Sequence, residues 1–323
     1  MATRSLAERI RGRSRMVVRR AQGRWATRSI LLRRYRELTG KDFVHDHPHT
    51  MTDKLFARML LVDRERDDSV TDLVDKYLMR RTVATIVGQD AIVPLLWHGT
   101  DPSSIPFDSL PDPCVLKPNH MTGGVVIITP DLDRDRAVRD ASGWLRENMY
   151  WPSREYQYFG VERRLVVEQF IDDGAPEGPL DYSFWCFHGE PHYLQIRNHT
   201  RDINCFVDMD FAPQDVYPPG TRDFTPSRPA GFERMTEIAR RLSAPFEFVR
   251  VDLYDIHGQL YVGELTFTPA SGKLRVSSPE WDEKLGALWR FDPDTPILPP
   301  SAAPAFRPRL LPPVAADERV AGS

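Results

Sequence analysis

The sequence predicts an α+β fold, because two kinds of periodicity alternate along its 323 residues. In some segments apolar residues recur every three to four positions, which is the spacing of one face of an α-helix. The predicted helical segments are 50–92, 134–149 and 230–243. Other segments alternate apolar and polar residues between glycines and prolines, a pattern typical of β-strands. The predicted strand segments are 114–129, 160–211 and 245–267.

The chain is expected to divide into four parts. These are a basic helical arm at 1–44, a mainly helical region at 45–113, the main domain at 114–291 and a proline-rich tail at 292–323. The tail holds eight prolines and is predicted to be extended or disordered. Five prolines also fall within 93–113, and they predict a loop-rich connection there.

Charge is distributed unevenly along the chain. Residues 1–40 carry 12 arginines and two acidic residues, a net charge of +10, whereas the whole chain carries −3. The remainder therefore carries −13, which argues against nucleic acid as the main partner. The basic arm fits two interpretations: a peripheral contact with an anionic membrane surface, or a solvated helix that packs on the body or on a partner.

Composition indicates a cytoplasmic protein. No apolar run approaches the ~18–20 residues of a membrane span, and the N-terminus lacks the apolar core of a signal peptide. The three cysteines, Cys114, Cys186 and Cys205, are odd in number and far apart. This spacing argues against a disulfide framework and against a CxxC zinc site. We therefore expect reduced thiols, with membrane association through the arm as the open alternative.

The segment PFEFVRVDLYDIHGQLYVGELTF at 245–267 is predicted to form a β-hairpin. A two-residue turn in it would place Glu264 beside Val251. A three-residue loop at 257–259 gives one clean apolar face instead, so we predict that loop. The residues of this apolar face are Val249, Val251, Leu253, Tyr261, Leu265 and Phe267, with Gly263 among them.

The other face of the predicted hairpin is polar. Asp252 lies opposite Glu264 on this face, and Arg250 lies opposite Thr266. Carboxylates that face each other across a strand pair have Cβ atoms ~5 Å apart, so they repel unless positive charge lies between them. Arg250 is one candidate for that charge, and a divalent cation is another; hard oxygen ligands favour magnesium shared with substrate phosphates. The alternative is an exposed salt-bridge cluster of Arg250 with the two acids.

A glycine-containing loop follows the first predicted strand. In CVLKPNHMTGGVVIIT, at 114–129, a short apolar strand delivers Lys117 and the next loop ends in Gly123-Gly124. Backbone amides of such a loop can cradle phosphates while a lysine adds positive charge. The stretch does not match the P-loop pattern, and a glycine pair is also the ordinary sign of a hairpin turn. A further apolar strand, RLVVEQFIDDG at 164–174, runs into an acidic turn.

Taken in order, these segments resemble the ATP-grasp superfamily, and more narrowly the teichuronopeptide-biosynthesis (TupA-like) ATP-grasp family. The resemblance covers residues 45–291 and is carried by TDKLFARML, DLVDKYLMR, FDSLPDPCVLKPNHMTGG, VVEQF, LDYSFWCFHGEPHYLQ, FVRVDLYDIHGQLYVGELTF and PEWDEKLGALW. It implies an ATP-grasp fold, in which two α+β lobes clamp ATP, with a helical N-terminal region.

The resemblance also implies where the nucleotide binds. Lys76 and Lys117 match the family's phosphate-binding lysines, and Asp181 matches the acid that usually holds the ribose hydroxyls. The hinge that hydrogen-bonds adenine, partly through backbone atoms, matches Glu168, Gln169 and Phe170. Arg197 lies in a polar stretch that fits either a contact with the γ-phosphate or substrate, or a solvated loop.

The superfamily's R-x-D…E pattern matches Arg250, Asp252 and Glu264. The resemblance implies that the two acids bind Mg²⁺ and that the arginine faces the transferred phosphate. Most members have asparagine two positions after the metal glutamate, whereas this sequence has Thr266. Threonine still offers an oxygen, so Thr266 remains a candidate ligand.

The activity that the resemblance implies is that of a Mg-ATP-dependent carboxylate–amine ligase. A carboxylate would be activated as an acyl phosphate and then attacked by an amine, and the product would belong to a cell-surface polymer or a peptide-like metabolite. The sequence leaves three alternatives open: an ATP-dependent phosphotransferase, a polysaccharide-biosynthesis protein associated with glycosyltransferases, and a non-catalytic nucleotide-binding scaffold.

Overall fold

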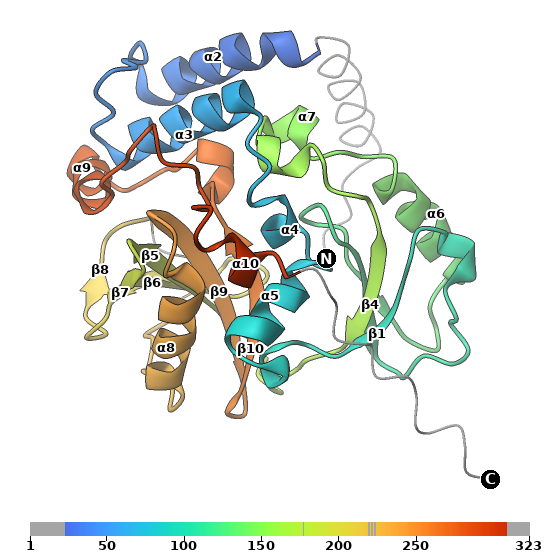
Figure 1. Cartoon of the computed structure of the whole chain (residues 1–323). Coiled ribbons are helices and arrows are strands. Elements are labelled where there is room, and N and C mark those ends of the chain that lie inside the picture. The colour runs from blue at the N-terminus through green and yellow to red at the C-terminus, as the bar shows by residue number, and fades with distance from the viewer. Residues whose placement is uncertain (1–22, 177, 219, 221, 223, 309–323) are drawn as a thin grey trace.

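The computed structural model describes residues 23–176, 178–218, 220, 222 and 224–308. Two antiparallel β-sheets organise this part of the chain, and helices pack on and between them (Figure 1). The smaller sheet has the strand order β1-β4-β2-β3, and the larger has the order β10-β9-β5-β6-β7-β8. The combination of helices with antiparallel sheets confirms the predicted α+β class.

The smaller sheet carries one wall of the candidate site. Its strands are β1 (Leu95–Gly99), β2 (Cys114–Pro118), β3 (Val126–Ile128) and β4 (Leu165–Gln169). Helix α6 (Arg134–Trp144) covers one face, where Leu116, Ala141 and Val167 share a buried apolar cluster. Because side chains alternate along a strand, Lys117 and Glu168 project from the opposite face.

Strand β1 corrects one sequence prediction, because it lies inside the segment 93–113 that was expected to be a loop-rich connection. The prolines of this segment flank the strand, at Pro94 and Pro102, and none interrupts it. An edge strand with proline outside its ladder keeps its hydrogen bonds, and β1 pairs with β4.

The larger sheet holds the main hydrophobic core against helix α8 (Phe232–Ser243). Its strands are β5 (Asp181–Phe187), β6 (Glu190–Arg197), β7 (Asn204–Asp208), β8 (Pro213–Gln214), β9 (Phe248–Ile256) and β10 (Gln259–Thr266). Val249, Val251 and Leu253 of β9 are fully buried in this core. The intervening residues of β9, Arg250 and Asp252, therefore project from the face that α8 does not cover.

Helices cover the remaining sides of the sheets, and most of the predicted helical segment 50–92 is confirmed. The α-helices not yet given are α2 (Thr27–Thr39), α3 (Met51–Glu65), α4 (Thr71–Val74), α5 (Met79–Ile86), α7 (Tyr150–Ser153), α9 (Pro279–Leu288) and α10 (Ala303–Phe306). Short 3₁₀ helices are η1 (Arg24–Ala26), η2 (Gln89–Ala91), η3 (Pro102–Ser104), η4 (Tyr156–Tyr158) and η5 (Pro269–Gly272). Helix α3 begins at a capping box, in which the side chains of Thr50 and Asp53 accept each other's backbone N–H.

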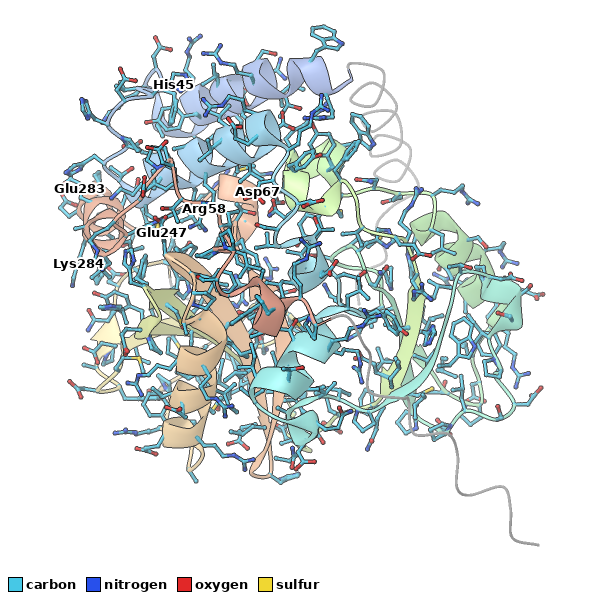
Figure 2. All side chains as sticks on the ribbon, viewed as in Figure 1. His45, Arg58, Asp67, Glu247, Glu283 and Lys284 are labelled. Atoms are coloured by element: carbon cyan, nitrogen blue, oxygen red, sulfur yellow. The ribbon has the colours of Figure 1, made fainter. Side chains whose placement is uncertain are left out.

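Arg58 fixes α3 to the end of the larger sheet. Its Nη1 donates to the carbonyl of Phe248 at 2.9 Å and to that of Phe267 at 3.4 Å, and its guanidinium lies 4.0 Å from the ring centre of Trp289. Figure 2 shows Arg58 near Glu247, whose carboxylate is 3.9 Å from Nη2. Burial lowers the pKa of Arg58 to about 9. The helical layer is therefore held to β9 by a buried cation.

The predicted basic arm is described only from residue 23 onward, and residues 1–22 lie outside the described part. Helix α2 confirms helical structure at 27–39, and it packs on α3 through Leu31, Tyr35 and Phe56. Among the described helices none is both long and apolar enough to cross a bilayer.

The proline-rich tail is not extended throughout, so that prediction is wrong for residues 292–308. Leu298 and Phe306 are buried in the main core, and Thr82 Oγ1 donates to the Phe306 carbonyl at 2.7 Å. Proline restricts the backbone but does not prevent neighbouring side chains from packing, and it is tolerated in the first turn of a helix such as α10. Residues 309–323 lie outside the described part.

Candidate active site

The turn of the β9–β10 hairpin has two residues, so the predicted three-residue loop at 257–259 is wrong. His257 and Gly258 have positive φ angles of 52° and 86°, and the flanking residues Ile256 and Gln259 pair directly. Positive φ at both central positions is typical of the two-residue turns that match strand twist.

A β-bulge at Gly263 restores the register further along the hairpin. Asp252 pairs with Glu264, and Arg250 pairs with Thr266. Both predicted pairings are therefore confirmed, because the extra residue lies in the bulge and not in the turn.

The shift between turn and bulge changes one residue of the predicted apolar face. Tyr261 pairs with Tyr254, and it does not belong to the main core. Leu260 and Val262 are buried there in its place. A one-residue change of register exchanges the two faces of a strand. In the part of β10 before the bulge, the side chains predicted to face the core therefore lie on the other face.

Arg250 lies between the two predicted metal carboxylates. Its Nε donates to Asp252 Oδ1 at 2.6 Å and its Nη2 to Asp252 Oδ2 at 2.5 Å. The same Nη2 donates to Glu264 Oε1 at 3.0 Å and to Thr266 Oγ1 at 3.1 Å, and Thr266 Oγ1 donates to Glu264 Oε1 at 2.9 Å. Four side chains from β9 and β10 thus form one connected polar cluster.

The two carboxyl groups of this cluster differ in acidity. Burial raises the pKa of Asp252 to about 7, and the negative charges of Asp181 and Glu264 add to this effect against the opposing charge of Arg250. Burial alone would also raise the pKa of Glu264, but the positive charges of Lys76 and Arg250 outweigh burial and hold it low. Positive charge that enters the site would therefore favour the ionised form of Asp252.

The donor set suits magnesium. Asp252 and Glu264 both reach one donor atom, Arg250 Nη2, so a single cation can contact both carboxylates. Mg²⁺ commonly takes one or two protein carboxylates and completes its shell with water and substrate phosphates. In the described part of the chain no group of three or more His, Cys, Asp or Glu side chains is placed to hold a metal.

Asp181 and Arg197 extend the cluster along β5 and β6. Arg197 Nη2 lies 2.7 Å from Asp181 Oδ2 and 3.7 Å from Asp252 Oδ2, and it donates to Ser183 Oγ at 2.9 Å. Its Nε is buried and has no hydrogen-bond partner among the described residues. Arg197, whose side chain is 13% exposed, thus belongs to the polar cluster and not to a solvated loop.

Lys76 reaches this cluster from the helical region. It lies between α4 and α5, and its Nζ is 3.6 Å from Glu264 Oε2. Its backbone N–H donates to the carbonyl of Asn119 at 3.0 Å, two residues beyond Lys117. The segment that carries Lys76 is therefore hydrogen-bonded to the end of the strand that carries Lys117, and both lysines lie where the two sheets meet.

Lys117 and Glu168 form an ion pair on the smaller sheet. Lys117 Nζ lies 2.5 Å from Glu168 Oε2, and Arg80 Nη1 lies 3.1 Å from Glu168 Oε1. The Glu168 carboxylate thus contacts two cations, which the sequence did not predict for a hinge residue. Arg80 was not predicted at all; the one sequence signal is its position four residues after Lys76, although Lys76 lies before α5 and Arg80 lies within it.

The remaining hinge residues lie at the end of β4. Gln169 has an exposed side chain, and Phe170 is half-buried. The backbone N–H of Gln169 donates to the carbonyl of Pro94 at 3.0 Å, so it is already used within the sheet. Adenine recognition at this hinge would have to use other backbone atoms.

The loop between β2 and β3 needs both of its glycines. Gly123 has a φ of 88°, in the left-handed region that favours glycine. A Cβ on Gly124 would lie 3.0 Å from the Pro118 ring and 3.1 Å from Trp144. The backbone therefore passes close to Pro118, the residue after Lys117.

The family model described as TupA-like ATPgrasp matches residues 53–290. The protein belongs to the TupA-like ATP-grasp family. The match includes both sheets and every candidate side chain from Lys76 to Thr266, and it confirms the resemblance inferred from the sequence.

Solved structures similar to this TupA-like ATP-grasp protein share little sequence identity with it. The D-alanine–D-alanine ligase from Bacillus anthracis complexed with ATP is 18% identical with a TM-score of 0.38, over 62% of this chain and 55% of that chain. The corresponding ligase from Helicobacter pylori is 16% identical with a TM-score of 0.44, over 75% and 70%. N5-carboxyaminoimidazole synthetase from Staphylococcus aureus is 15% identical with a TM-score of 0.38, over 61% and 45%. This chain thus spans about half the length of the first and third. No curated protein matches it.

Proposed function

We propose that this TupA-like ATP-grasp protein is a Mg-ATP-dependent ligase that activates a carboxylate as an acyl phosphate for attack by an amine. The observation that supports this most directly is the meeting of Lys76 with Glu264 at 3.6 Å. It brings a candidate phosphate-binding cation from the helical region to the candidate metal carboxylates of the larger sheet. A site for a phosphate chain with its magnesium needs both kinds of group together.

Each side chain then has a distinct role in the proposed reaction. Lys76 and Lys117 bind phosphate oxygens and hold the nucleotide in place. Arg250 stabilises negative charge on the transferred phosphoryl group, and the unpartnered Nε of Arg197 donates to a nucleotide oxygen. Bound Mg²⁺, held by Asp252 and Glu264, would neutralise phosphate charge during the transfer.

The chemistry proceeds in two steps. An oxygen of the substrate carboxylate attacks the γ-phosphorus of ATP, and the bond to the β-phosphate oxygen breaks, so that ADP leaves. The amine then attacks the carbonyl carbon of the acyl phosphate. Inorganic phosphate leaves, the amine loses a proton, and an amide remains. The ligase requires both a carboxylate and an amine for phosphate release.

The first experiment measures phosphate release from Mg-ATP by the purified protein, with pools of amino acids, amino sugars and uronic acids. The matched control is the Asp252→Ala/Glu264→Ala variant, which loses both candidate metal ligands. Release that needs a carboxylate and an amine, and that disappears in the variant, would support the ligase. A phosphorylated product formed without an amine would identify a phosphotransferase, and binding without turnover would identify a scaffold.

The proposed product is a cell-surface polymer or a peptide-like metabolite. Support for this comes from membership of the TupA-like family. The alternative role beside glycosyltransferases in polysaccharide biosynthesis predicts the same classes of acceptor, so the uronic acid and amino sugar pools test both. Stimulation by amino acids alone would favour the peptide-like metabolite.

We also propose that the helical region contacts an anionic membrane, where such acceptors are assembled. Trp25 is 84% exposed in η1, directly before α2. It borders a groove of about 910 Å³, whose charged lining residues are Arg24, Arg28, Arg64 and Arg66 with Asp46 and Asp63. Figure 2 shows His45, another groove residue, in the outer helical layer beside α2. An exposed tryptophan among arginines suits the interface of an anionic bilayer.

The membrane contact is tested by sedimentation with vesicles of anionic or neutral lipid. Deletion of 1–40 would remove Leu31 and Tyr35 from a buried cluster, so the deletion should end at residue 22. We expect binding to anionic vesicles that falls in this deletion and in the Trp25→Ala/Arg28→Glu variant. Equal sedimentation of all three proteins would refute the contact.

A further inference from the structure

Arg80 is attached to the candidate nucleotide site through a shared carboxylate. Its Nη1 donates to Glu168 Oε1 at 3.1 Å, and its Nη2 donates to the carbonyl of Val93 at 2.6 Å. The side chains of Arg80 and Glu168 are only 11% and 7% exposed. The other oxygen of Glu168 lies 2.5 Å from Lys117 Nζ. One buried carboxylate is therefore divided between two cations, and one of these is a candidate phosphate ligand.

The second cation changes what Lys117 can do. Without Arg80, the pair of Lys117 and Glu168 would have no net charge, and breaking it would leave a buried carboxylate without a partner. Such a loss is costly in a protein interior. With Arg80 present, the three groups carry a net charge of +1. Glu168 keeps a partner when Lys117 turns towards a phosphate.

The short segment that carries Arg80 contacts both sheets. Lys76 and Arg80 are four residues apart, and α4 and α5 lie between the two sheets (Figure 1). Lys76 contacts Glu264 of the larger sheet, whereas Arg80 contacts Glu168 of the smaller sheet. The short segment 76–80 thus delivers one cation to each wall of the site.

We propose that Arg80 is a positioning residue that occupies one oxygen of Glu168 and thereby leaves the charge of Lys117 available to the phosphates of ATP. This inference rests on the proposed function, since it assumes that Lys117 binds the nucleotide. Arg80 itself does not contact the nucleotide, and its effect passes through Glu168.

The test is a double-mutant cycle read out as the Kd for Mg-ATP, measured by isothermal titration calorimetry. The proteins are wild type, Arg80→Gln, Glu168→Gln and the double variant. We expect Arg80→Gln to raise the Kd about tenfold, as for a lost charge-assisted hydrogen bond. The same substitution should change the Kd by less than about twofold when Glu168 is already glutamine, because the coupling between the two is then absent.

Two further variants separate positioning from general structural effects. Arg80→Lys keeps the charge but cannot contact Glu168 and Val93 together, so it should give an intermediate Kd. Arg81→Gln changes the next residue of α5, which forms no ion pair with Glu168 or Lys117 in the described structure, and it should leave the Kd unchanged. Thermal unfolding of each variant checks folding; if Arg80→Gln does not fold, Arg80→Lys takes its place in the cycle.

Two outcomes would overturn the inference. An equal loss of affinity in both backgrounds would mean that Arg80 acts as a general positive charge, independently of Glu168. No loss in either background would mean that Lys117 does not need Arg80. Failure of the wild-type protein to bind Mg-ATP is a different result, because it would overturn the proposed function and with it the role of Arg80.

Discussion

Replacing Gly263 with alanine should disturb the candidate metal site from within the β9–β10 hairpin. Gly263 is the extra residue of the bulge that brings Asp252 opposite Glu264. A Cβ at this position would lie 2.8 Å from Cε2 of Tyr254, which is closer than such contacts occur in proteins. Burial raises the pKa of Tyr254, and the charges of Asp181, Asp252 and Glu264 add to the effect. The ring that must move therefore lies beside the acidic groups of the site.

The cost of this substitution follows from overpacking. Forcing an extra methyl group into a packed position costs about 1–3 kcal/mol, so the free energy of unfolding should fall by about that amount. The overlap can be relieved by moving the Tyr254 ring or by shifting the bulge, and both displace the pairing of Asp252 with Glu264. Displacing either carboxylate weakens its contact with the cation that neutralises the phosphates. We expect the Kd for Mg-ATP to rise by roughly tenfold, as for a lost charge-assisted hydrogen bond.

Gly258 offers a matched control in the same hairpin. Its φ of 86° disfavours alanine, but no atom lies within 4 Å of a Cβ built there. Gly258→Ala should cost about 1–2 kcal/mol of stability through backbone strain, with no change in the Kd for Mg-ATP. Denaturant unfolding and titration calorimetry measure the two quantities. The reasoning would be refuted if Gly263→Ala bound Mg-ATP as wild type does, or if both variants lost affinity equally.

Substitutions at three other positions test separate features. Arg58→Met removes the donor to two buried carbonyls and should lower the free energy of unfolding by about 2–4 kcal/mol; an unchanged denaturation midpoint would contradict this. Burial raises the pKa of Glu155 above its ordinary 4.5. The unfolded chain therefore loses this proton first, and the free energy of unfolding should fall as pH rises above 4.5. Glu155→Gln should reduce this dependence of the free energy of unfolding on pH. An unchanged dependence would contradict the role given to Glu155. Thr266→Val removes the hydroxyl that bridges Arg250 and Glu264 and should raise the Kd for Mg-ATP about threefold to tenfold, whereas Thr266→Asn should not.

The polar face of the hairpin could be predicted from the sequence, but its turn could not. Alternation along β9 places Arg250 and Asp252 on one face, and this assignment does not depend on the position of the turn. A three-residue loop and a two-residue turn followed by a bulge bring the same residues, Glu264 and Thr266, opposite them. The choice between these depends on the left-handed conformations of His257 and Gly258 and on the fit of Gly263 against Tyr254. Those are properties of the packed hairpin.

The contacts of Glu168 illustrate a second limit. Its place at the end of β4 follows from the resemblance of the VVEQF segment, but its two partners come from elsewhere in the chain. Arg80 lies 88 positions earlier and meets Glu168 only because α5 packs beside the smaller sheet. Likewise, the burial of Phe306 depends on the main core that receives it, and local proline content cannot reveal it. Sequence patterns identify the faces of elements, whereas tertiary packing decides which faces meet.

Each predicted cation of the candidate site is paired with a predicted carboxylate in this structure, and Arg80 adds one further positive charge beside Glu168. The pairs are Lys76–Glu264, Lys117–Glu168, Arg197–Asp181 and Arg250–Asp252. ATP can take cations from these pairs only if the released carboxylates find other partners. Mg²⁺ supplies that partner for Asp252 and Glu264, so the nucleotide and the metal should assist each other's binding.

The coupling between ATP and Mg²⁺ predicts the direction in which each ligand changes the affinity for the other. ATP should bind the wild-type protein much more weakly with a chelator present than with Mg²⁺, and by linkage Mg²⁺ should bind more tightly when ATP is present. In Asp252→Asn/Glu264→Gln the carboxylates that need the metal are gone. The Kd for ATP without Mg²⁺ should therefore be lower in this variant than in wild type, although the Kd for Mg-ATP is higher. The variant could instead lose affinity both for ATP alone and for Mg-ATP. That result would mean that Asp252 and Glu264 stabilise the folded site, and it would refute their role as metal ligands.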